Sequence, residues 1–120
     1  MTVHDIIKLA FANEYEDFET DPEASRFSID VLNMLIADAF EAEQYYREMH
    51  GQTPLTAIPS VSDIGDTVSY NDGLTRIAFP YGIEWKFCEQ NLEIEKAAEY
   101  RALYERARDA HGGRYYRRKV

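Results

Sequence analysis

The side chains that could do chemistry in this sequence begin with its three histidines. His4, His50 and His111 each fall on or near an expected helix end. A protonated imidazole is favourable at a helix C-terminus, which explains His50 and His111 without a catalytic role. None of the three is paired with another ligand at metal spacing, and the absence of a Glu-x-x-His pair argues against a di-iron bundle.

Cys88 and three aspartates are the other candidates. A single cysteine cannot form an internal disulfide, and its place in an apolar run favours a buried structural thiol over a nucleophile. Asp63, Asp66 and Asp72 could act beneath a loop lid or bind calcium, but their spacing is not that of an EF-hand. No phosphate loop, serine elbow or zinc spacing occurs. We therefore expect no catalytic, cofactor-binding or metal-binding residues, and no enzyme activity.

The residues best suited to binding stand after Gly112-Gly113. They are the aromatic and basic residues Arg114, Tyr115, Tyr116, Arg117, Arg118 and Lys119. Tyrosines can stack on bases while arginines neutralise phosphates, but an acidic body would repel nucleic acid and four cations release few counterions. Aromatic anchors beside arginines suit a groove on a partner protein better. We expect residues 112–120 to be a flexible basic tail that binds a protein.

Charge divides the chain into an acidic body and a basic end. Residues 1–100 hold 6 Lys and Arg against 20 Asp and Glu, net −14, whereas residues 101–120 hold 7 against 2, net +5. This division is typical of an interaction protein, although a solvated tail without a partner stays open. No apolar run reaches the roughly 18 residues of a membrane span, and no signal peptide pattern precedes the body. The single cysteine fits a reducing cytosol.

Hydrophobic spacing predicts one all-α domain over residues 1–111, a small bundle of about four helices. We expect helices over residues 2–15, 20–50, 80–90 and 92–110. The second is expected to be a single central rod of about 45 Å, capped at its start by threonine and stopped by glycine. Its start is preceded by an acidic connector that is expected to be solvated.

A long loop is expected over residues 51–76, which are rich in proline, glycine and small polar residues. Val68 and Tyr70 alternate with polar neighbours, which leaves a short strand or β-hairpin open. Asn71-Asp72-Gly73 is strong turn chemistry. A connection of this length is uncommon in a compact domain unless it has a function.

The long helix carries more apolar surface than one small bundle needs. Its expected seam consists of Ser28, Leu32, Leu35, Ala39, Ala42, Tyr46 and Met49. Residues 29–40 are apolar nearly all round, which is typical of a helix that is buried on several sides or shared with a partner subunit. The candidate subunit-interface residues are Ile29, Ile36, Phe40, Tyr70 and Trp85.

A set of residues, mostly between positions 63 and 104, resembles the small head–tail connector (adaptor, or head completion) proteins of long-tailed bacteriophages. The residues that carry the resemblance are Asp63, Val68, Tyr70, Leu74, Ala78, Pro80-Tyr81-Gly82, Glu89, Glu95, Ala98, Tyr100 and Tyr104, with Asp30, Val31, Leu32 and Asn33 in the long helix. The resemblance covers about two-thirds of the chain. The order of these residues is more specific than any one of them.

This resemblance implies an all-helical virion neck protein, made in the host cytoplasm, that forms a ring of usually twelve copies. Such a ring bridges the portal protein and the next neck or tail component, and DNA passes through its lumen without sequence-specific binding. The C-terminal segment would clasp the portal. Two alternatives remain open from the residues: a small acidic cytosolic regulatory or protein-binding module, and an enzyme that uses the long loop as a lid.

Overall fold

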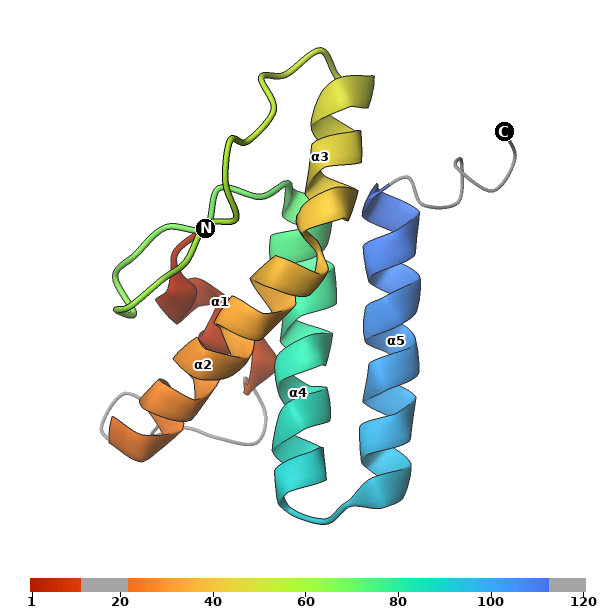
Figure 1. The fold of residues 1–120 in the computed structure, drawn as a ribbon. Coiled ribbons are helices and arrows are strands. Elements are labelled where there is room, and N and C mark those ends of the chain that lie inside the picture. Colours follow the sequence, from red (N-terminus) through yellow and green to blue (C-terminus); the bar gives the residue numbers. More distant parts are fainter. Residues whose placement is uncertain (12–21, 113–120) are drawn as a thin grey trace.

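The structure, a computed structural model, describes residues 1–11 and 22–112, apart from the side chain of His111. Within those residues the chain forms five α-helices and one π-helix (Figure 1). In order they are α1 (Val3–Ala10), α2 (Pro22–Asp38), α3 (Phe40–Met49), the π-helix η2 (Gly73–Ala78), α4 (Phe79–Gln90) and α5 (Ile94–Gly112). The predicted all-α fold is confirmed, with five α-helices in place of the expected four.

The helices pack around an antiparallel pair formed by α4 and α5. Figure 1 shows these two helices side by side and joined by a short turn, with α2 crossing α4. Helix α1 packs on α4, and α3 lies against α5. The short strand or β-hairpin that the sequence left open does not form in the described residues, where the extended backbone makes only an isolated antiparallel bridge between Thr2 and Thr67.

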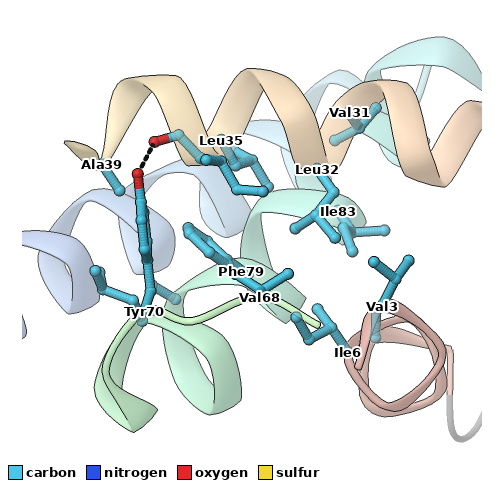
Figure 2. Close-up of a cluster of buried hydrophobic side chains, with 14 of the residues drawn as sticks. Val3, Ile6, Val31, Leu32, Leu35, Ala39, Val68, Tyr70, Phe79 and Ile83 are labelled. Carbon is cyan, nitrogen blue, oxygen red and sulfur yellow. Dashed lines mark hydrogen bonds between the residues drawn. The ribbon is translucent and has the colours of Figure 1, made fainter. Parts of the chain in front are cut away.

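The core joins α1 to α2, the long loop and α4. Thr2 caps α1, since its hydroxyl accepts a hydrogen bond of 3.2 Å from the Asp5 amide. Helix α1 ends at Ala10, earlier than the expected residue 15. Four apolar residues of α1 are buried, Val3, Ile6, Ile7 and Ala10. Figure 2 shows Val3 and Ile6 pointing toward the side chains of α2 and α4.

The single rod predicted over residues 20–50 is wrong, because α2 and α3 are separate helices with Ala39 between them. The Tyr70 hydroxyl donates a hydrogen bond of 2.8 Å to the Ile36 carbonyl (Figure 2). In a continuous helix that oxygen accepts from the amide of Phe40, four residues later. A side chain that enters this ladder is a recognised cause of a helix break. Tyr70 lies 34 positions from Ile36 and therefore leaves no mark on the helical periodicity.

Most of the apolar surface of α2 is covered by the chain itself. Val31, Leu32, Leu35 and Ile36 are at most 7% exposed, whereas Met34 is 42% exposed. The expectation that this helix has surplus apolar faces for a neighbouring subunit is thus wrong for most of its length. This coverage comes from α4 and from the long loop, which the sequence pattern placed no closer to α2 than any other segment.

Side-chain amides hold the long loop against α2 and α3. The amide group of Asn33 makes two hydrogen bonds with the Val61 backbone, both 2.8 Å long. Gln44 makes the same pair of bonds, also 2.8 Å, with the Leu55 backbone. Each pair satisfies the donor and the acceptor of an extended residue as a neighbouring strand would. The loop is therefore fixed to the body at these two points.

A buried carboxylate fixes the end of the loop and the start of η2. Glu43, which is 1% exposed, accepts hydrogen bonds from Arg47 Nε at 2.6 Å and from the backbone and side-chain nitrogens of Asn71 at 2.7 and 2.9 Å. Arg47 also donates to the Thr53 and Ser69 carbonyls. Residues 71–73 do not turn as predicted. The Asn71 side chain instead accepts from the Leu74 amide, so a helical segment begins there.

Candidate protein-binding site

The loop aspartates maintain local structure. Asp66 accepts hydrogen bonds from the Ser62 amide at 2.8 Å and the Asp63 amide at 3.1 Å, and these bonds lower the pKa of its carboxyl below the ordinary value of 3.8. Asp72 lies on the surface, 3.7 Å from Arg76. Among residues 1–11 and 22–112, no group of three His, Cys, Asp or Glu side chains could hold a metal ion.

The cysteine and the histidines also have structural positions. Cys88 is 2% exposed, which confirms the predicted buried thiol. His50 follows α3, where its ring lies 2.9 Å from the Tyr46 carbonyl and stacks on the Tyr46 ring with centroids 4.0 Å apart. His4 is the second residue of α1. The side chain of His111 lies outside the part that the structure describes.

A polar cluster joins the end of α2 to α5. Asp38 accepts hydrogen bonds from the Tyr104 hydroxyl at 2.6 Å and from Arg108 at 2.7 Å, and Arg108 donates to Asp109 at 3.1 Å. Burial raises the pKa of Tyr104, and its bond to Asp38 adds to the effect. Burial opposes the charge on Arg108, but its bonds to both carboxylates outweigh this and raise its pKa. Arg108 therefore belongs to the body, although the charge count placed it in the basic end.

Trp85 is on α4 and packs against Tyr104 of α5, so its own chain partly covers it. Its ring stacks on Tyr104 with centroids 5.9 Å apart, and Lys86 and Arg101 stand over it at 4.3 and 5.3 Å. The indole nitrogen donates to Glu89 at 3.2 Å. Trp85 thus retains some exposed surface, but its main contacts are internal.

The other predicted interface residues separate into two groups. Ile36 and Tyr70 are 0% and 5% exposed and belong to the core of this chain, so they offer no surface to a neighbour. Ile29 and Phe40 are partly buried. The structure does not bring the five candidates together into one exposed patch. The predicted tail residues, Arg114 to Lys119, lie outside the described residues.

The most exposed apolar side chains lie where α4 meets α5. We call Leu92 and Ile94 the hairpin tip; they are 81% and 66% exposed. Leu92 has φ of +61°, and no other non-glycine residue in the described ranges has a positive φ. Its amide bonds to Glu89 and the next amide, that of Glu93, bonds to Cys88, the pattern of a Schellman helix end.

The same type of helix end closes α3, where the corresponding residue is Gly51 with φ of +65°. There the Gly51 amide bonds to Glu48 and the Gln52 amide to Arg47. Glycine is usual at this position because it has no Cβ to clash. At the tip a leucine occupies it and also exposes its side chain to water. Both features are unfavourable in the isolated chain, and neither was foreseen from the sequence.

The hairpin tip lies at the start of α5, whereas the basic tail follows the last residue of α5, Gly112, in the sequence. The helix has 19 residues and is therefore about 28 Å long. Figure 1 shows the α4–α5 turn at one end of the bundle and the last residue of α5 at the other. Exposed Glu89, Glu93 and Glu95 surround the tip. The acidic and apolar tip thus lies about one helix length from Gly112, the last described residue before the basic segment.

These features define a small all-α bundle with an exposed apolar tip. Comparisons with protein-family models, with curated proteins and with solved structures find no match to this chain. Within residues 1–11 and 22–112, none of the helices combines the length and the apolar character needed to cross a membrane.

Proposed function

We propose that this protein is a structural connector of a phage neck, a head–tail adaptor that acts by binding other proteins. In this role it forms a homo-oligomeric ring, of about twelve copies by the resemblance, between the portal protein and the next neck or tail component. It uses no cofactor and catalyses no reaction. Its place is in the virion, after synthesis in the host cytoplasm.

The observation that carries this proposal is the exposed apolar tip at the start of α5, the end opposite to Gly112, after which the basic aromatic segment follows in the sequence. A protein that joins two others needs two contact sites that face different ways. Leu92 supports such a role because an exposed leucine with a left-handed backbone destabilises the free chain, and contact with a partner removes at least the exposure. The tail adds tyrosine and arginine, residue types that are enriched at the centres of protein interfaces.

Charge supports the same proposal. The chain has a formal net charge of −9, and the exposed carboxylates at the tip belong to this excess. A wall of carboxylates would keep the phosphates of passing DNA from adhering. Negative charge alone also fits the second candidate, a small acidic module that occupies a basic site on another protein. The exposed apolar tip favours the connector, because a purely electrostatic module has no need of it.

The proposal is tested by binding to the portal protein of the same phage. Purified portal rings are incubated with the wild-type chain, with a tip variant (Leu92→Gly with Ile94→Ser) and with a tail variant (Arg117→Glu with Arg118→Glu). The matched control is Ile58→Ser, since Ile58 is also exposed (54%) but lies in the loop between Leu55 and Val61, which are bonded to α3 and α2 rather than to α4 or α5. Sedimentation measures which chains join the ring.

We expect the wild type and the control to co-sediment with portal rings. The tip and tail variants should lose the complex or its stacking on the next component. If no chain joins the portal, and the wild type instead displaces DNA from a basic protein as a monomer, the acidic module is the better description.

A further inference from the structure

The side chains of the hairpin tip project beyond the packed part of the bundle. Leu92 and Ile94 have the two largest exposed fractions, 81% and 66%, among the large apolar side chains of residues 1–11 and 22–112. Ala97, about one turn further along α5, is only 5% exposed, so one face of α5 is packed from there on. The turn itself is held by a hydrogen bond of 2.9 Å from the Glu93 amide to the Cys88 carbonyl. The tip is therefore a defined apolar surface outside the core.

Negative charge surrounds these two side chains. We call the exposed glutamates beside the tip its rim; they are Glu89, Glu93 and Glu95. Residues 89–95 contain no basic residue, although Lys86 lies 3.3 Å from Glu89 and Lys96 follows directly after the rim. A carboxylate at the start of a helix is favourable, which accounts for part of the rim but not for its apolar neighbours. A partner that complements this surface brings apolar groups and positive charge together.

We propose that the hairpin tip and its rim bind the basic tail, residues 113–120, of a second copy of this chain. The tail holds four basic residues, two tyrosines and no acidic residue. Its tyrosine rings would cover the apolar side chains of the tip, and its arginines would lie beside the glutamates of the rim. Tyrosine and arginine are the residue types that most often anchor protein interfaces, and arginine pairs with carboxylates through two parallel hydrogen bonds.

Two other occupants complement the tip less well. The tip of a second copy would bring one rim of three glutamates against another, and like charges facing each other across an interface are unfavourable. Nucleic acid would meet the same repulsion through its phosphates. The tail is the stretch of this sequence in which aromatic residues and an uninterrupted excess of basic residues occur together.

The length of the chain prevents the tyrosines from covering the tip of their own copy. Helix α5 runs from Ile94 to Gly112, which places its ends about 28 Å apart. Tyr115 and Tyr116 stand three and four residues after Gly112, a reach of at most about 14 Å in extended conformation. A contact between these tyrosines and a tip can therefore form only between copies.

A contact between the tip of one copy and the tail of the next joins two different surfaces. Such heterologous contacts close into rings or extend into filaments. The inference deepens the proposed function, because it names a contact between subunits of the ring; it rests on that function only for the place of the ring in the virion. In this arrangement the tail joins neighbouring subunits, whereas the resemblance implies that it clasps the portal.

Reversing the charges on each side tests the contact with full-length chains and without the portal. In the rim variant, Glu93→Lys and Glu95→Lys make the surroundings of the tip basic. In the tail variant, Arg117→Glu and Arg118→Glu make the tail acidic. A combined variant carries all four substitutions, so its rim and its tail are again of opposite sign.

The matched control reverses two carboxylates elsewhere, Asp30→Lys on α2 and Glu48→Lys on α3. Both residues are exposed, and the change in net charge equals that of the rim variant. Sedimentation velocity measures association at about 50 and 500 mM NaCl, because added salt screens exposed charges. Circular dichroism confirms that each variant folds.

We expect the wild type and the control to self-associate at low salt and to dissociate as salt is added. The rim variant and the tail variant should each associate at least about tenfold more weakly. The combined variant should associate again, and so should an equal mixture of the rim and tail variants. A wild type that stays monomeric, a combined variant that folds but stays monomeric, or a tail variant that associates like the wild type would overturn the inference. Portal binding is scored separately, so this failure leaves the proposed function standing.

The apolar part of the contact has its own readout. Leu92→Gly should weaken the association about ten- to a hundredfold, the value of one buried leucine, whereas the exposed loop substitution Ile58→Ser should have no effect. Mixed with a chain that carries Tyr115→Ala and Tyr116→Ala, the Leu92→Gly chain should form a dimer that grows no further, because the pair holds one intact tip and one intact tail. A mixture that stays monomeric, or Leu92→Gly that associates like the wild type, would overturn this part of the inference.

Discussion

Replacing Leu92 with glycine should stabilise the free chain and weaken its assembly. Glycine removes the cost of a left-handed backbone at φ of +61°, which is about 1 kcal/mol net of the added freedom of the unfolded chain. Leu92 is 81% exposed, so the lost burial is about a fifth of the roughly 2 kcal/mol for a whole side chain. The expected gain is roughly 0.5 kcal/mol.

For a chain of this length that gain is a rise in Tm of about 2 °C, measurable by circular dichroism with urea unfolding as a second probe. The matched control is Gly51→Ala. Gly51 has φ of +65°, and nothing lies within 4 Å of an added Cβ, so the loss of about 1 kcal/mol is purely conformational. In assembly the sign reverses, since a leucine buried by a partner contributes about 1.5–3 kcal/mol.

Two outcomes would contradict this reasoning about the tip. If Leu92→Gly lowers the free energy of unfolding, the side chain supports the isolated fold. If Leu92→Gly raises stability and portal binding is unchanged, the leucine is not a contact residue. Only a variant that is more stable and assembles less well agrees with the account.

Three further substitutions test the fold that supports these surfaces. Tyr70→Phe removes the donor to an α2 carbonyl and should lower the free energy of unfolding, measured with urea, by about 1–2 kcal/mol. An unchanged free energy would mean that this hydrogen bond does not account for the helix break. Gly82→Ala places a Cβ 2.6 Å from a methyl group of Leu35 and should lower the free energy of unfolding by about 1–3 kcal/mol. In the control Gly65→Ala, the added Cβ meets nothing within 4 Å and should be tolerated. Equal losses of stability in the two variants would refute the packing argument. The lowered pKa of Asp66 contributes stability above the unfolded value near 3.8, which is lost as the pH falls through the lower folded pKa; Asp66→Asn should therefore reduce the acid dependence of Tm, and an unchanged profile would contradict the assignment.

Local sequence patterns predicted much of the helical structure. The helices expected over residues 2–15, 80–90 and 92–110 correspond to α1, α4 and α5, and the predicted glycine stop follows α3, because such signals depend on neighbours within a few residues. The threonine cap expected for the second helix lies outside the described residues. The seam was largely right, since Leu32, Leu35 and Ala39 are buried, although Met49 is 59% exposed. These features follow from backbone geometry and helical periodicity alone.

The missed features depend on contacts between distant residues. The break near Ala39 requires Tyr70, and the fixed loop requires Asn33 and Gln44 on helices that the sequence does not place beside it. Asn71 looked like a turn residue because its short side chain bonds to local backbone; here the same property starts a helix. Helical periodicity cannot indicate such pairings, because it reflects only the spacing of residues within one helix.

The sequence predicted the kind of binding surface but not its position in the structure. Tail composition indicated a protein partner, and that remains a prediction. The predicted interface combined apolar residues of the long helix with Tyr70 and Trp85, but Ile36 and Tyr70 are buried in this chain's own core. Leu92 was overlooked because a leucine in a glycine position gives no hydrophobic pattern.

The central claim is that the two ends of α5 are contact sites in an assembled neck. Electron cryomicroscopy of the portal ring incubated with this chain tests it most directly. We predict a ring of subunits on the portal, with Leu92 and Ile94 covered by protein density. A portal that carries no such ring, or a ring in which both side chains face solvent at every contact, would contradict the account.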